Sequence, residues 1–510
     1  MATEAQTAHS TGLPRQPHPD PPTPDRRART AGTTWIWFLA AGLFALYAVV
    51  SVRLHQRVRT TGFDLGIVEQ AVRGFASGGA PIVEVEGPDA NLLGDHFSPA
   101  YAALAPLYRV FPTPVTILLA QAFLLAIAVV PIARYAQRVL GRPAAVVVGL
   151  GYGLSWGIAE AVGFDAHEVM FAVPLTAGSV VALAERRLRA AVLWALPLLL
   201  VKEDLGLTVA AVGALVAWFG ARRLGLATVV AGLAGTAVEV FWLLPANTPE
   251  GTFSAWWDSH RRSDDSGGLG AHLERVTVGL FEHEPKVVLL ILLVAPTAMV
   301  ALRSPLLLLV LPTLAWRLTS DNALYWGTSY HYSAVLMPVV FVAFVDGLRR
   351  LRAHQGPARI REALAISAVV TALLVPAHPL WSAVRPSTWA DEPRVADARA
   401  VLAPIPDDAQ VQASNRLVPQ LTARAEVSVF GSRQSRPNPE WIVVDRTDPV
   451  NWPFDALADQ DAFVDLARET GYGVVLERGE YVLLRRSTDD PRQFPPPESA
   501  PEEAGVAPGE

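Results

Sequence analysis

The sequence predicts a mainly α-helical, polytopic membrane protein with a small α/β domain near its C-terminus. Of the 510 residues, 51% are hydrophobic and only 18% are charged, which is too apolar for a soluble protein of this length. The apolar residues form continuous runs of roughly the 20 residues that a helix needs to cross a bilayer. The runs lack the alternation typical of outer-membrane β-barrels, and they therefore indicate helices.

The two ends of the chain differ in composition from the rest. Residues 1–33 are rich in Pro, Thr, Ala and Arg, and residues 488–510 are rich in Pro and Glu. Both segments are predicted to be disordered tails, the first of them cytoplasmic. The sequence contains no cysteine, which excludes disulfides, thiolate nucleophiles and Cys-based metal sites.

About eleven membrane spans are predicted from the apolar runs. The first is interpreted as an uncleaved anchor, because a long polar tail precedes it. Two short runs that contain proline, 190–202 and 304–316, are expected to be half-spans or parts of broken helices. The runs cover residues 34–52, 115–133, 143–162, 167–185, 190–202, 204–220, 224–245, 287–302, 304–316, 332–348 and 363–380.

The positions of Lys and Arg predict the orientation of these spans. Eleven alternating spans place the basic clusters that flank them on one side, which the positive-inside rule makes cytoplasmic. The N-terminus is then inside and the C-terminus outside, in a multi-pass protein of the cytoplasmic (plasma) membrane. The basic clusters lie at 26–29, 134–142, 186–189, 222–223, 303 and 349–361. The expected domains are a transmembrane domain at 34–385, with outer loops at 53–114 and 246–286, and an extracytoplasmic α/β domain at 392–487.

The α/β domain is predicted from local patterns. VQASNRLVPQL is typical of a strand followed by a helix, and WIVVDR of a buried strand. DALADQDAFVDLARETGY has the apolar spacing of an amphipathic helix. GVVLER and YVLLRR are expected to form a hairpin around Gly479 and Glu480.

The predicted topology gathers the unusual ionisable residues on the outer side. Lys202, Glu203 and Asp204 interrupt an apolar run, where each charge costs roughly 2.5–3.5 kcal/mol at the bilayer centre. These three residues form either a short external turn or part of a polar cavity open to the outside. The whole outer set is Asp64, Glu69, Asp95, His96, Asp165, His167, Glu168, Lys202, Glu203, Asp204, Asp258, His260, Asp321 and His331.

Two carboxylate–imidazole pairs recur in the outer loops. They are Asp95 with His96, and Asp165 with His167, and such pairs tune a histidine as a base or bind a divalent cation. Solvated loop residues are the alternative. Asp64 begins an amphipathic helix and is either its N-cap or a functional carboxylate.

Aromatic and basic residues also occupy the outer loops. The aromatic residues suit either an interfacial aromatic belt or a surface that stacks on sugar or holds lipid, and they are Trp256, Trp257, Tyr325, Trp326, Tyr330 and Tyr332. His260, Arg261 and Arg262 suit either a phosphate or the lipid headgroups. The sequence lacks a G-x-x-x-x-G-K loop, an H-E-x-x-H pattern and a basic domain, which argues against an ATPase, a zincin protease and nucleic-acid binding.

Six motifs together resemble the bacterial and archaeal membrane family called domain of unknown function 2079, over residues 35 to 487. They are FDLGIVEQAVRGFASG, GDHFSPAYAALAPLYRVFPTP, QAFLLAIAVVPIARYA, GFDAHEVMFAVPL, LVKEDLGL and YHYSAVLMPVVF. The architecture of that family is similar to the GT-C superfamily of membrane glycosyltransferases, which use polyprenyl-phosphate sugar donors. The resemblance implies that Asp64 matches the catalytic acid of the first outer loop. Many such enzymes have a paired acidic signature there, whereas Asp64 is followed by Leu65.

The leading hypothesis is therefore a glycosyltransferase that moves a sugar from a polyprenyl-phosphate donor in the membrane lipid to a cell-envelope acceptor. The catalytic residues would be Asp64, Asp95 and His96, and a divalent metal (Mg or Mn) would bind Asp64, Asp95, His96 and His167. Lys202 or Arg261 would neutralise the departing phosphate. The expected substrate-binding residues are Glu69, Asp165, His167, Glu168, Lys202, Glu203, Asp204, Arg261, Tyr330 and His331. The alternatives are a transporter or lipid flippase that uses Lys202, Glu203 and Asp204, and a non-catalytic cell-envelope scaffold.

Overall fold

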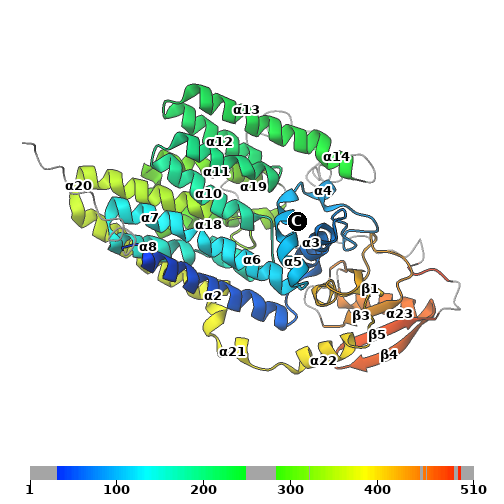
Figure 1. The fold of residues 1–510 in the computed structure, drawn as a ribbon. Helices are drawn as coiled ribbons and strands as arrows, with labels where there is room; N and C mark the ends of the chain where they lie inside the picture. Colours follow the sequence, from blue (N-terminus) through cyan, green and yellow to red (C-terminus); the bar gives the residue numbers. More distant parts are fainter. Residues whose placement is uncertain are drawn as a thin grey trace, which may run out of the picture.

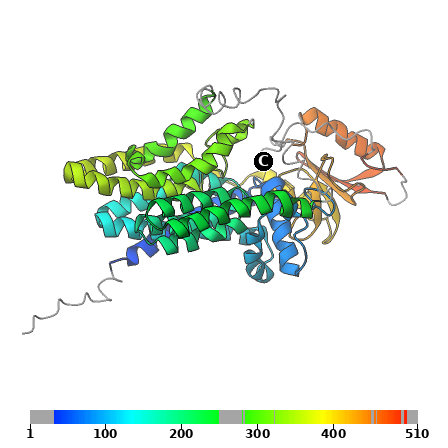
Figure 2. The ribbon, with the colours of Figure 1, turned by 90° about the horizontal axis from the view of Figure 1, so that it is seen from above.

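A bundle of apolar helices lies against a small five-stranded sheet in the computed structural model (Figure 1). The structure describes residues 32–248, 279, 283–320, 322–447, 452–454, 456–487 and 492–495. The two predicted tails and most of the predicted loop 246–286 lie outside the described residues. Figure 2 shows the bundle at one end of the molecule and the sheet at the other.

Five helical segments of the described chain are long and apolar enough to cross a membrane. They are Thr34–Gln56, Pro114–Leu140, Arg142–Gly163, Arg222–Asn247 and His354–Ala377. Shorter apolar helical segments lie beside them, at Val169–Ala184, Leu188–Leu200, Leu205–Trp218 and Pro305–Thr319. Nine of the predicted apolar runs coincide with these nine segments, while the count of about eleven spans and their orientation stay predictions.

The bundle consists of thirteen described α-helices, and short turns join most of them. They are α2 (Thr34–Gln56), α6 (Pro114–Ile127), α7 (Val129–Leu140), α8 (Arg142–Gly153), α9 (Trp156–Gly163), α10 (Val169–Ala184), α11 (Leu188–Ala195), α12 (Leu205–Trp218), α13 (Arg222–Val238), α14 (Leu244–Asn247), α18 (Glu284–Val294), α19 (Leu311–Thr319) and α20 (Leu336–Leu374). α20 turns back on itself at Gly356, whose φ of 78° suits glycine, and Pro357 begins the second half. The two predicted spans 332–348 and 363–380 are the two halves of α20.

The predicted span 287–302 is a broken helix in the structure. Its helix α18 ends at Val294, and Ala298 and Met299 have left-handed φ angles of 49° and 59°. Pro296 lies in this break, where it has no backbone N–H to continue a helical hydrogen-bond ladder. The predicted short runs 190–202 and 304–316 contain the 3₁₀ segments Leu196–Leu200 and Pro305–Val310, each next to a short α-helix.

The segment between α2 and α6 forms several short elements at the end of the bundle that faces the sheet. The π-helical turn Gly62–Gly66 leads into α3 (Ile67–Ser77). α4 (Leu92–Asp95), the 3₁₀ helix Pro99–Leu104 and α5 (Ala105–Val110) follow. The predicted amphipathic helix is α3, which buries Val68 and Val72.

The sheet has the strand order β2-β1-β3-β5-β4. β1 (Gln410–Ala413) pairs in parallel with β2 (Glu426–Val429) and β3 (Trp441–Asp445), while β5 (Tyr481–Arg486) is antiparallel to β3 and to β4 (Tyr472–Arg478). β3, the hairpin β4–β5 and helix α23 (Leu457–Glu469) lie where the sequence predicts them. The helix expected after β1 is only the 3₁₀ turn Val418–Gln420. Helices α21 (Pro386–Trp389) and α22 (Pro393–Leu402) connect the sheet to the bundle.

Alternate residues of the central strand β3 are buried in two different hydrophobic cores, one on each face of the sheet. Ile442 and Val444 of β3 pack with residues of α23. Trp441 and Val443 of the same strand share a second core with Leu65 and Val68 of the segment that precedes α6. The sheet and the first loop segment are therefore one packed unit, because their apolar side chains exclude water together.

Candidate functional site

A cavity of about 650 Å³ lies at the end of the bundle that faces the sheet. Its polar lining comes from the turn before α3, from α4, and from the chain immediately before α10, α12 and α20. One wall is apolar and is contributed by α12, by α13 and by the π-helical turn after α13, through Leu207, Leu233, Ala237 and Val240. Nine of the predicted site residues line this cavity: Asp64, Asp95, His96, His167, Glu168, Lys202, Glu203, Asp204 and His331.

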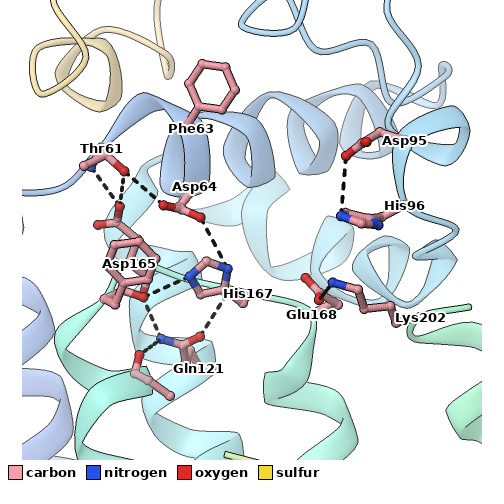
Figure 3. Close-up of polar contacts among 12 residues, drawn as sticks. Thr61, Phe63, Asp64, Asp95, His96, Gln121, Asp165, His167, Glu168 and Lys202 are labelled. Carbon is pink, nitrogen blue, oxygen red and sulfur yellow. Dashed lines mark hydrogen bonds and ion pairs between the residues drawn. The ribbon is translucent and has the colours of Figure 1, made fainter. Parts of the chain in front are cut away.

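Asp64 lies in the π-helical turn Gly62–Gly66 and is 6% exposed. One carboxylate oxygen, Oδ2, accepts a hydrogen bond of 3.1 Å from the hydroxyl of Thr61. The other, Oδ1, is 3.5 Å from Nδ1 of His167 (Figure 3). The N-cap residue of α3 is Gly66, two residues after Asp64, and the Asp64 carboxylate lies beside the histidine.

His167 is held in one orientation by its neighbours. Its backbone N–H donates to Oε1 of Gln121 at 3.0 Å, and its Nε2 lies 3.1 Å from the carbonyl oxygen of Phe164. A carbonyl can only accept, so we assign the proton of the neutral ring to Nε2. Nδ1 then faces Asp64 with a lone pair, and the two groups together can take up one proton.

The ring of His331 stacks on that of His167, with centroids 3.6 Å apart and planes inclined by 22°. Burial and the adjacent His167 lower the pKa of His331 well below its usual range. His331 is therefore neutral at physiological pH, which avoids two positive charges in the stacked pair.

His96 lies between two carboxylates. Its Nδ1 is 3.0 Å from Oε1 of Glu203, and its Nε2 is 3.7 Å from Oδ2 of Asp95. Burial opposes the charged ring, but Asp95 and Glu203 outweigh burial and the repulsion of Lys202, and they raise the pKa of His96 to about 10. Burial would in turn raise the pKa of Glu203, but His96 and Lys202 outweigh it and lower that pKa. His96 and Glu203 thus form an ion pair at neutral pH.

The pH dependence of stability tests the pairing of His96. Its folded-state pKa of about 10 is above the ordinary 6.5, so its contribution to stability is complete below pH 6.5 and is lost as pH rises through 10. We expect the thermal unfolding midpoint of the wild type in detergent to exceed that of His96→Gln at pH 6, and the difference to shrink towards pH 10. The exposed His354, changed to glutamine, is the control. A difference between wild type and His96→Gln that is constant with pH would contradict the pairing.

Lys202 is paired with Glu168 inside the cavity. Its Nζ is 2.9 Å from Oε1 of Glu168, whose Oε2 accepts a 3.3 Å hydrogen bond from the hydroxyl of Tyr101. The Lys202 and Glu168 side chains are 17% and 8% exposed. An ammonium group has three donors, so further acceptors can be bound beside Glu168.

Some buried polar atoms at this site have no hydrogen-bond partner within the described part of the chain. They are Oε2 of Glu203, Oδ1 of Asp204 and Nδ1 of His331. The second oxygen of Asp204 accepts a 3.0 Å hydrogen bond from Nε1 of Trp316. Unsatisfied buried acceptors are costly, and a ligand that brings hydroxyl groups would satisfy them.

Three predicted site residues do not line the cavity. Glu69 is fully buried and accepts hydrogen bonds from Tyr108 and Thr422, while burial raises its pKa to about 7. Oδ2 of Asp165 accepts bonds from the backbone N–H and the hydroxyl of Thr61, at 2.8 and 2.6 Å. Burial raises the pKa of Asp165 to about 7 as well.

The third of these residues, Tyr330, packs its ring edge-on against Phe164, with centroids 4.7 Å apart. Seven further residues named from the sequence lie outside the described residues: Trp256, Trp257, Asp258, His260, Arg261, Arg262 and Asp321.

The described residues do not form the predicted metal site. Within residues 32–248, 283–320 and the later described ranges, no group of three or more His, Asp or Glu side chains is placed to hold an ion. Asp64 contacts His167, and Asp95 contacts His96, as two separate pairs.

Several residues that shape the site were not predicted. Gln121 donates to the carbonyl oxygens of Ala161 and Asp165 and so fixes the turn that carries His167. Arg317 is fully buried and donates to the carbonyl oxygens of Tyr325 and Gly327, which fixes the turn before His331. Both are polar residues within or next to an apolar run, and this signal could have identified them.

Comparisons with known proteins agree with this architecture. The model of a family described as predicted membrane protein (DUF2079) matches residues 54–483. Among solved structures, ArnT from Cupriavidus metallidurans in the apo state has 17% sequence identity and a TM-score of 0.50, with 89% of this chain and 98% of that chain covered. The structure of ArnT bound to undecaprenyl phosphate has 17% identity and a TM-score of 0.49, with 90% and 99% covered. No curated protein matches the chain.

Proposed function

The chain belongs to the DUF2079 family of predicted membrane proteins, and we propose that it is a GT-C-type glycosyltransferase that takes its sugar from a polyprenyl-phosphate donor. The observation that carries this proposal is one cavity in which a proton acceptor, a partly buried cation and an apolar wall face the same space. The ArnT-like fold supports the same class. The acceptor is proposed to be a cell-envelope molecule at the outer face of the cytoplasmic membrane.

The proposed donor is a lipid phosphate because the cavity has two chemically different sides. Its apolar wall continues along α13 and the π-helical turn Glu239–Leu243 that follows it, where Leu233 and Phe241 are 50% and 77% exposed, as suits contact with a lipid chain. Lys202 and the charged His96 lie on the polar side, where a phosphate group would be bound. ArnT has been crystallised bound to undecaprenyl phosphate, and we propose a lipid of this class for the present chain.

In the proposed reaction, an acceptor hydroxyl attacks the anomeric carbon of the donor sugar. The proton of that hydroxyl passes to the pair formed by Asp64 and His167. The bond between the anomeric carbon and the phosphate oxygen breaks, and the electron pair leaves with the phosphate. Lys202 stabilises the additional negative charge, since a phosphate leaving group needs charge compensation more than protonation.

The sugar itself is proposed to bind at the acidic side of the cavity. Oε2 of Glu203 and Oδ1 of Asp204 are buried acceptors that sugar hydroxyls would satisfy. Tyr325, Tyr332 and Trp316 line the same space and offer apolar ring faces to the sugar ring. The predicted Mg or Mn ion has no assigned step, because the described residues do not form a ligand group for it.

The test is transfer by the purified protein in lipid nanodiscs. A panel of polyprenyl-phosphate donors with labelled sugars is incubated with cell-envelope acceptors, and labelled product and released polyprenyl phosphate are measured. We expect one donor to be consumed by the wild type, with the same rate in EDTA as with added Mg²⁺ or Mn²⁺. Consumption of no donor would contradict the proposal, and movement of donor lipid across the bilayer without transfer would favour a flippase.

A further inference from the structure

We infer that the C-terminal sheet holds Asp64 in its reactive position, with Asn415 and Val418 as positioning residues. This inference rests on the proposed function for its catalytic meaning, whereas the holding contact itself can be measured without any reaction. The sequence suggests a separate outer domain at 392–487. The contacts described below make part of that domain a component of the site.

Asn415 follows β1 and is 2% exposed. Its side-chain oxygen accepts hydrogen bonds from the backbone N–H of Gly62, at 2.8 Å, and of Phe63, at 3.4 Å. The backbone oxygen of Asn415 accepts a further bond of 2.9 Å from the N–H of Gly62. These donors open the π-helical turn that carries Asp64, and Asn415 thus fills the role of a helix cap from a distant part of the chain.

Val418 packs directly against the same turn. A Cβ atom built on Gly62 would lie 2.8 Å from Cβ of Val418, and one built on Gly66 would lie 3.0 Å from its Cγ1. The two glycines flank Asp64 on either side and permit this close approach. The π-helical turn therefore packs against the 3₁₀ turn Val418–Gln420 on one side and borders the cavity on the other. The contacts of Asn415 and Val418 with this turn are called the clamp below.

The contact continues along α3 beyond the clamp. Nε2 of Gln70 donates to the carbonyl oxygen of Val427 at 2.8 Å, and Arg73 donates to those of Thr422 and Ala425 at 2.7 and 3.1 Å. All three acceptors lie in the chain between the end of the 3₁₀ turn Val418–Gln420 and the end of β2. The orientation of α3, and of the turn that begins it, is thus set by the sheet.

The clamp also reaches the cavity wall. Phe63 lines the cavity next to Asp64, and its ring meets that of Trp452 edge-on, with centroids 3.9 Å apart. Catalytic rates are sensitive to such placement, because a displacement of about 1 Å at a reacting group can lower a rate roughly 100-fold. Single π-helical turns are rare and occur frequently at functional sites, which fits a turn that external contacts must maintain.

The test compares Asn415→Ala with Asn415→Asp and with Gln412→Ala. Gln412 is buried on β1 and donates to the carbonyl oxygen of Arg436, away from the turn, so it controls for general damage to the sheet. We expect Asn415→Ala to lower kcat by roughly 10- to 100-fold with little change in the KM for the donor. Asn415→Asp keeps an acceptor oxygen and should retain most of the activity.

Hydrogen exchange of the peptide that covers residues 61–66 supplies a readout independent of activity. We expect faster exchange in Asn415→Ala than in the wild type and Gln412→Ala, because the N–H of Phe63 loses its acceptor. Unchanged exchange would overturn the inference whatever the activity, and so would faster exchange with an unchanged kcat. If the wild type transfers no sugar, the proposed function fails, while faster exchange would still establish the holding contact.

Discussion

Replacing Asp64 by asparagine is expected to lower the rate of sugar transfer by roughly 100- to 10,000-fold, the range that a positioned general base contributes. The amide keeps the size of the side chain and an oxygen for the hydroxyl of Thr61, but it cannot take up a proton beside Nδ1 of His167. The initial rate of labelled product formation measures the effect, and donor binding should change little.

The control for this variant is Asp89→Asn in the same loop. Asp89 is exposed, does not line the cavity and has a φ of 63°, a conformation that asparagine adopts readily. We expect Asp89→Asn to transfer sugar at the wild-type rate. Full activity in Asp64→Asn, or an equal loss in both variants, would exclude Asp64 as the base.

Replacing Lys202 by methionine is expected to affect both stability and transfer. The change leaves the carboxylate of Glu168 buried without its ammonium partner, and breaking a buried pair in this way costs about 3–5 kcal/mol. Transfer should also be lost, because the leaving phosphate is no longer neutralised. Thermal unfolding in detergent and product formation measure the two effects separately.

The double variant Lys202→Met/Glu168→Gln separates these two roles. It removes both charges, so the unfolding midpoint should recover most of the loss while transfer stays low. If the double variant recovers transfer together with stability, Lys202 is only a structural partner of Glu168. If Lys202→Met alone transfers sugar normally, the proposed role of Lys202 in leaving-group stabilisation is wrong.

The hydropathy pattern predicted most helices of the bundle, because a run of about 20 apolar residues matches the length that a helix needs to cross a bilayer. It could not find the break in the predicted span 287–302, where the apolar composition continues through Pro296 and the left-handed Ala298 and Met299. Proline shows where a helix can end, but packing decides whether it ends or kinks.

The cavity could be predicted in part because unpaired charges are rare in apolar segments. Lys202, Glu203 and Asp204 stood out for this reason, and all three line the cavity. Glu69 and Asp165 were predicted from their place in the outer loops, and they face other partners. The residue type alone does not indicate whether a carboxylate points into the cavity or into a packed interface.

Asn415 lacked any signal in the sequence. It acts through hydrogen bonds from backbone N–H groups, which every residue except proline possesses, so neither its partner nor its role leaves a pattern. The sheet domain was predicted as a soluble unit from the amphipathic spacing of its own elements. Its second apolar face, which packs on the segment before α6, could be assigned only from the structure.

The clamp on Asp64 joins Gly62 and Asn415, which are 353 positions apart in the chain. At a synthesis rate of about 5–20 residues per second, the turn around Asp64 would wait roughly 20–70 s for the residues that hold it. A product of translation that is interrupted before residue 415 would carry Asp64 without its clamp. The turn around Asp64 would therefore be held in place only after residue 415 has been made and the sheet has begun to form.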